Sequence, residues 1–108
     1  MATINLEEVV DLARYNEIIA TNQLVVVDFH ATWCGPCKLI APKLKLLAKE
    51  LPSVVFIKVN VDDAPDISAP AGIRAMPTLF FFKDGEKVNE VVGSDWPKIE
   101  QFALALAA

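Results

Sequence analysis

Metal-binding side chains are scarce in this sequence, which has two cysteines and one histidine among its 108 residues. A structural zinc site takes four ligands, chiefly cysteine thiolates and histidine nitrogens. These three side chains fall short of that number, so only a site shared between chains could hold the ion. We therefore expect no metal site.

Runs of lysine or arginine are also missing, and the formal net charge is −4. Nucleic acids and anionic membranes attract basic patches, so we expect neither as a partner. No apolar stretch approaches the roughly 18 residues of a membrane-spanning helix. The N-terminus lacks the basic flank and apolar region of a signal peptide. These absences predict a cytoplasmic protein, although a mature organellar chain whose targeting segment had been removed would look the same.

No repeat, low-complexity segment or linker interrupts the chain, whose residues are 54% hydrophobic and 22% charged. That composition excludes a disordered chain. A chain of this length can build one hydrophobic core. We expect a single domain over residues 1–108 that is a monomer.

Both cysteines lie in one short segment, Trp33-Cys34-Gly35-Pro36-Cys37. Residues three apart on a helix lie on neighbouring turns, about 5–6 Å apart between Cβ atoms. This separation is close to what a disulfide needs. A bond that closes so short a loop adds little stability, which argues against a purely structural role. The spacing therefore predicts a pair that switches between dithiol and disulfide.

The position of the pair predicts different roles for the two sulfurs. A helix that begins near Cys34 directs its free N–H groups and positive dipole end at that sulfur, which favours the nucleophilic thiolate. Cys37 lies one turn further in and should be less exposed. We expect Cys34 to attack and Cys37 to resolve the mixed disulfide. Gly35 and Pro36 shape the turn, since proline suits the first turn of a helix.

Apolar runs rich in β-branched residues predict buried strands at 24–29, 54–61 and 79–82. Helical periodicity predicts helices at 12–21 and 34–51, a short irregular helix within 62–73 capped by Asp62 or Asp63, and a last helix after Ser94 or Asp95. Asp84-Gly85 predicts a hairpin turn that leads into a strand at 87–92. This order predicts a parallel sheet with helices on both faces and an antiparallel C-terminal hairpin.

Two segments resemble the signatures of the thioredoxin family: residues 26–42 (VVDFHATWCGPCKLIAP) and residues 75–78 (AMPT). The likeness extends from about Val9 to the C-terminal helix. It implies the α/β thioredoxin fold, a central mixed five-stranded sheet flanked by four helices. It also favours a strand at 8–10 before the helix at 12–21, where pattern alone would allow one helix over 5–20. Tyr15 and Ile19 should then face the core.

The resemblance implies a protein-disulfide reductase that exchanges a dithiol for a disulfide in its substrate proteins. No cofactor would be bound. Electrons would come from NADPH through a flavoenzyme, thioredoxin reductase, so the expected partners are this reductase and proteins that contain disulfides.

Asp28 is the anomaly within the first buried strand. An unpaired carboxylate there costs several kcal/mol, so its pKa should rise. We interpret it as a buried proton acceptor for Cys37, the role of this position in the family. The alternative is a strand-end carboxylate that reaches water. By resemblance Lys58 lies beside Asp28 and tunes it, although a lysine that extends to the surface is an alternative.

The contact surface for substrates is expected at Trp33, Met76, Pro77 and Gly93. In the family the Met76–Pro77 bond is cis and its backbone pairs with the substrate chain, whereas the sequence alone would predict trans. Gly93 would line the groove, or it could be a plain turn glycine. Trp33 would shape the surface beside Cys34, or it could pack into the core.

His30 departs from the resemblance, because the family usually has an aromatic residue at this position. Histidine titrates near neutral pH, so His30 could add a pH dependence to activity. We favour the simpler interpretation that its ring packs as an aromatic stand-in.

Two other functions fit the same features. An oxidase or isomerase would run the exchange in the opposite direction, and the residues between the cysteines help to set that direction. Gly35-Pro36 resembles the reducing members. A binding module would keep the cysteine pair as a vestige or use it as a clamp for a partner.

Overall fold

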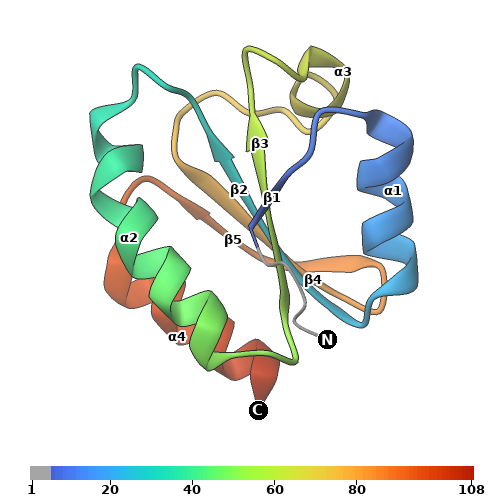
Figure 1. Cartoon of the computed structure of the whole chain (residues 1–108), viewed down its shortest axis with the longest axis vertical. Helices are drawn as coiled ribbons and strands as arrows, with labels where there is room; N and C mark the ends of the chain where they lie inside the picture. The colour runs from blue at the N-terminus through green and yellow to red at the C-terminus, as the bar shows by residue number, and fades with distance from the viewer. Residues whose placement is uncertain (1–5) are drawn as a thin grey trace.

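The computed structural model describes residues 6–108, so the first five residues of the expected domain lie outside the described part of the chain. The elements within this range follow the predicted order (Figure 1). They are β1 (Glu7–Glu8), α1 (Leu12–Thr21), β2 (Leu24–His30), α2 (Gly35–Glu50), β3 (Val55–Asn60), α3 (Pro65–Ser68), β4 (Thr78–Lys83), β5 (Glu86–Val92) and α4 (Trp96–Ala107).

The strands form one mixed sheet in the order β1-β3-β2-β4-β5. The three strands β1, β3 and β2 are parallel, β4 runs antiparallel to β2, and β5 returns beside β4. Helices α2 and α4 cover one face, and α1 and α3 lie on the other side (Figure 1). This is the mixed five-stranded sheet with four helices that the resemblance implied. None of the helices between Leu6 and Ala108 is long and apolar enough to cross a membrane.

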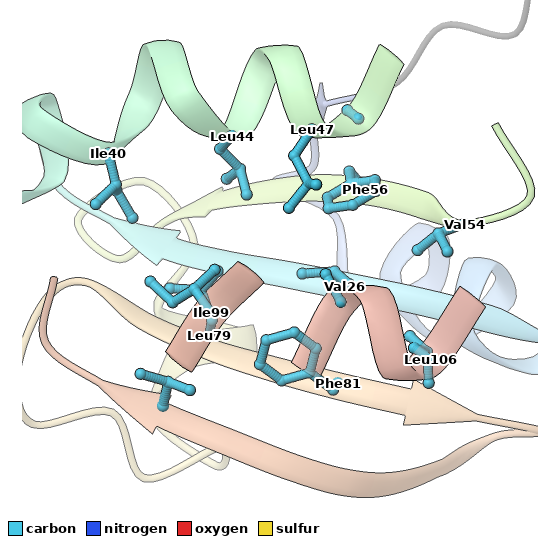
Figure 2. Packing of buried hydrophobic residues seen from close by; sticks show 13 residues of the cluster. Val26, Ile40, Leu44, Leu47, Val54, Phe56, Leu79, Phe81, Ile99 and Leu106 are labelled. Atoms are coloured by element: carbon cyan, nitrogen blue, oxygen red, sulfur yellow. The ribbon is translucent and has the colours of Figure 1, made fainter. Parts of the chain in front are cut away.

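Strand β2 is buried on both faces because each face meets a separate apolar cluster. Val26 packs with α2, α4 and their neighbours, whereas Val25 and Val27 pack on the α1 side. Figure 2 shows Ile40 and Leu44 of α2 pointing toward the sheet in the first cluster. A strand buried on both sides reads as a continuous apolar run. The same burial places any polar residue of β2 in the interior.

Several local predictions needed correction. The first strand is Glu7–Glu8 rather than residues 8–10. Tyr15 is buried as expected, but its buried partner on α1 is Ile18, and Ile19 is only partly buried. The predicted caps of α3 were wrong, because Ala64 precedes it and makes no side-chain capping bond.

The C-terminal half follows its turn and cap signals. Asp84 and Gly85 both have positive φ, 53° and 85°, as a tight hairpin turn of this kind requires. Asp95 caps α4 by accepting a hydrogen bond from the N–H of Lys98. Trp96 packs partly buried against the core, and Lys43 Nζ lies 6.0 Å from its ring centroid. Trp96 therefore contributes to the packing of the core.

Candidate active site

The two cysteines lie where β2 gives way to α2. Cys34 is the N-cap of α2, and its Sγ accepts a hydrogen bond from the N–H of Cys37 at 3.1 Å. Gly35 and Pro36 form the first turn. The sulfurs are joined in a disulfide across a Cα–Cα distance of 5.3 Å, so the predicted pair forms. In the reduced protein the same N–H and the helix dipole favour a thiolate on Cys34.

The relative exposure of the cysteines differs from the prediction. Cys34 is 4% exposed and Cys37 is 6% exposed, so Cys37 is not the more buried residue in this oxidised state. Both sulfurs lie in a small cluster with Ala31, and Met76 packs against it. The disulfide holds the two side chains at similar depth, which residue spacing along a helix does not predict.

Asp28 lies beneath the pair in the interior of β2. It is 3% exposed, and its Oδ1 is a buried atom that has no hydrogen-bond partner among residues 6–108. Burial raises the pKa of Asp28 to about 6, and the charges of His30 and Lys58 act in the opposite direction. The alternative of a strand-end carboxylate is wrong, because β2 continues to His30. A carboxyl group with this pKa can accept a proton near neutral pH.

A pocket connects Asp28 with the second cysteine. It has a volume of about 140 Å³, and Asp28, Cys37, His30 and Lys58 are among its lining residues. Lys58 is the register partner of Asp28 on β3, as the resemblance implied. A second pocket of about 390 Å³ also borders Asp28 and Lys58. Pockets of these sizes admit water.

The raised pKa of Asp28 gives a stability prediction. The folded protein binds a proton at Asp28 more tightly than the unfolded chain, whose pKa is near 3.8. The stability advantage of the protonated carboxyl is therefore complete below pH 3.8 and is lost as the pH rises through about 6. Asparagine does not ionise, so Asp28→Asn avoids the loss of stability that accompanies ionisation of the buried carboxyl. The substitution should raise the free energy of unfolding by about 2–3 kcal/mol at pH 8.

Urea unfolding of the native protein and Asp28→Asn at pH 8 and pH 3 measures this effect. The difference between the proteins should nearly vanish at pH 3, where Asp28 is neutral in both folded and unfolded states. A variant that is less stable at pH 8, or a difference that is independent of pH, would contradict the burial cost assigned to Asp28.

Trp33 is a surface residue and not part of the core. Its side chain is 66% exposed, and Nε1 donates a hydrogen bond to Oδ2 of Asp62 at 2.8 Å. This hydrogen bond fixes the orientation of the indole of Trp33, the residue that directly precedes Cys34 in the sequence. The core-packing alternative is therefore wrong. Sequence reasoning missed Asp62 as the partner, since it treated this residue as a helix cap.

The segment Met76-Pro77 and Gly93 complete this end of the sheet. The Met76–Pro77 bond is cis, as the resemblance implied and unlike the prediction from sequence alone. The N–H of Gly93 donates a hydrogen bond to the carbonyl of Pro77 at 2.7 Å. Gly93 has φ of 96°, a region that favours glycine. The N–H of Gly93 thus holds the proline segment, a contact that fits both the groove role and the turn role.

Sequence reasoning also missed a partner of His30. The Nε2 atom of His30 lies 3.1 Å from Oε2 and 3.2 Å from Oε1 of Glu8. No local signal points to this contact, because the two residues are 22 positions apart and meet only when β1 joins the sheet. Across residues 6–108, no three His, Cys, Asp or Glu side chains group as ligands for a metal ion.

The sequence is similar to those of known proteins. The family model described as Thioredoxin matches residues 7–105. Thioredoxin-1 of Schizosaccharomyces pombe is 46% identical over 95 residues, which cover 88% of this chain and 92% of the relative. Thioredoxin of Oryctolagus cuniculus is 44% identical over 97 residues, with coverage of 88% and 92%.

Solved structures agree with the fold. The crystal structure of oxidised mitochondrial thioredoxin 3 from Saccharomyces cerevisiae superposes with a TM-score of 0.90. It is 36% identical to this chain, and the match covers 94% of this chain and 95% of that one. The sequence and structure comparisons therefore agree over nearly the whole described chain.

Proposed function

The chain belongs to the thioredoxin family of protein-disulfide oxidoreductases, which need no bound cofactor, and we propose that Cys34, Cys37 and Asp28 perform its dithiol–disulfide exchange. The observation that supports these roles most strongly is the disulfide at the N-terminus of α2, with Asp28 and Cys37 on one pocket. The reaction it supports best is the reduction of disulfides in other proteins, by a single domain of residues 1–108 that acts as a monomer.

The proposed cycle begins with the reduced pair. The Cys34 thiolate attacks one sulfur of the substrate disulfide, so a mixed disulfide forms and the first substrate sulfur leaves as a thiolate. Asp28 then takes the proton from Cys37 Sγ, directly or through water. The new Cys37 thiolate attacks Cys34 Sγ and releases the second substrate sulfur. Two electrons have passed to the substrate, its thiolates take up protons, and the Cys34–Cys37 disulfide remains.

The contact surface for the substrate is proposed around Trp33, Met76, Pro77 and Gly93. Trp33 offers an exposed ring next to Cys34 in sequence. Met76 packs against the cysteine cluster, and Gly93 anchors the carbonyl of Pro77. An extended substrate chain can pair with backbone groups of the proline segment, a mode that adds main-chain hydrogen bonds to side-chain recognition. Gly35, Pro36 and Lys58 are proposed to modulate the site through the turn and the charge beside Asp28.

The proposed electron source is NADPH, delivered through a flavoenzyme thioredoxin reductase. The partners are this reductase and proteins with accessible disulfides, and the proposed location is the cytoplasm. An organellar location is the alternative, because thioredoxin 3 of Saccharomyces cerevisiae, which is similar to this chain, is mitochondrial.

A reconstituted assay tests this function. The chain, NADPH, a thioredoxin reductase and a protein with accessible disulfides such as insulin should together oxidise NADPH in proportion to the thiols formed. Omission of the chain should return NADPH oxidation to background. Direct reduction of the Cys34–Cys37 pair by dithiothreitol separates a failure of the reductase from a failure of the exchange. An unchanged substrate in the presence of the reduced pair would contradict the proposal.

A further inference from the structure

His30, which lines the pocket of about 140 Å³ beside Asp28, forms a pair with the carboxylate of Glu8. Strand register places Glu8 on β1, Lys58 on β3 and Asp28 on β2 in one row, so their side chains lie on the same face. His30 lies two residues beyond Asp28 on β2 and shares that face. Glu8 and His30 reach across β3, and Nε2 of His30 lies within 3.2 Å of both carboxylate oxygens.

The two partners differ in exposure, because His30 is largely buried and Glu8 lies at the surface. The side chain of His30 is 13% exposed, whereas that of Glu8 is 44% exposed. His30 lines the pocket of about 140 Å³ together with Asp28 and Cys37. The imidazole therefore faces the pocket, with the carboxylate of Glu8 on its Nε2.

We propose that His30, held by Glu8, is a positioning residue for proton transfer: the charge on its imidazole sets the fraction of Asp28 that is carboxylate, and thereby the rate at which Cys37 is deprotonated. This inference rests on the proposed role of Asp28 in disulfide exchange. It makes the rate of disulfide exchange depend on the charge of His30.

The charges around His30 support this coupling. Asp28 on β2, Lys58 on β3, Glu8 on β1 and the groups of α2, Cys37 and Lys38, are the titratable side chains that face it or share its pocket. The positive charges of His30 and Lys58 lower the pKa of Asp28, while Glu8 raises it. Glu8 Oε2 lies 3.1 Å from Nε2 of the imidazole. The aromatic ring that the family usually has here carries no such charge.

The contact with Glu8 also revises the interpretation of His30 as an aromatic stand-in. A phenylalanine ring can fill the same space, but it has no nitrogen to bond to a carboxylate. Two substitutions can therefore distinguish a packing role of His30 from a charge role. His30→Phe keeps the ring and removes the charge, and His30→Lys keeps a charge and removes the ring.

The experiment is a titration of the Asp28 carboxyl carbon by NMR in the oxidised native protein, His30→Phe and His30→Lys. Removing the charge should raise the pKa of Asp28 by about one unit, a shift typical of losing a nearby opposite charge. His30→Lys should hold that pKa within a few tenths of a unit of the native value. An equal shift in both variants, or no shift in His30→Phe, would overturn the proposal.

The rate at which Cys37 resolves a mixed disulfide on Cys34, measured from pH 5.5 to 8.5, is the second readout. In His30→Phe the acid limb of this rate profile should move to higher pH, by the same number of pH units as the pKa of Asp28. A merely structural role would lower the rate at every pH and leave the profile in place, and that result would overturn the proposal.

Glu7→Gln is the matched control for charge on β1, because Glu7 pairs with Arg14 instead of His30. It should leave the pKa of Asp28 and the rate profile unchanged, and an effect equal to that of His30→Phe would overturn the assignment to this pair. The two proposals fail separately. If the native protein performs no disulfide exchange, the proposed function fails, while the carboxyl titration still decides whether His30 controls Asp28.

Discussion

Cys34→Ser should abolish disulfide reduction, with a rate that falls to the background of the assay. The variant retains Cys37, but the N-cap position, whose sulfur accepts a hydrogen bond from the first turn of α2, belongs to Cys34. The chain has no third cysteine that could replace the nucleophile. A serine hydroxyl is not ionised near neutral pH, and here no adjacent base activates it. The measurement is the initial rate of substrate thiol formation with excess reductant.

Folding of the Cys34→Ser variant is expected to remain intact, because the serine oxygen can still accept the N–H of Cys37 and cap α2. Circular dichroism and the thermal midpoint of the reduced proteins provide this control. Reduction of the substrate by a folded Cys34→Ser variant would contradict the assignment of the nucleophile.

Cys37→Ser converts the reaction from turnover to covalent capture. Cys34 can still attack a substrate disulfide, but no thiol is available to break the bond that forms. Mixed disulfides between Cys34 and substrate should accumulate to about one per chain, and multiple turnover should cease. Mass spectrometry of the intact adduct, with and without dithiothreitol, measures both the stoichiometry and the reversibility.

The double variant Cys34→Ser/Cys37→Ser is the matched control and should capture nothing. Normal turnover by Cys37→Ser, or adducts that form equally well in the double variant, would refute the resolving role of Cys37. Because Cys37 and Asp28 line the same pocket, Asp28→Asn should slow resolution without preventing capture.

Features that depend on neighbouring residues were predictable from the sequence. Asp11 caps α1, and Asp84-Gly85 forms the hairpin turn, because both signals act within a few residues. The spacing of the cysteines and Pro36 predicted a disulfide at the start of a helix. The apolar run of β2 predicted the burial of Asp28, since a strand covered on both faces leaves little access to water.

Features that depend on tertiary register were not predictable in this way. Glu8 meets His30 because β1 and β2 flank β3, and no periodicity in the sequence describes that arrangement. Trp33 donates its hydrogen bond to Asp62, which lies 29 positions further along the chain. The cis bond before Pro77 came from the resemblance alone, because isolated sequence favours trans. The similar depth of the two cysteines follows from the disulfide itself.

The midpoint potential of the Cys34–Cys37 pair tests the central claim most directly. The protein is equilibrated in dithiothreitol or glutathione buffers of known potential, and free thiols are counted by the mass shift of an alkylating reagent. A reductase requires a two-electron titration at a strongly reducing potential, near the value of about −270 mV known for thioredoxins. A potential near the −120 mV or so of disulfide-forming enzymes would contradict the reductase account while leaving the fold and the cysteine pair in place.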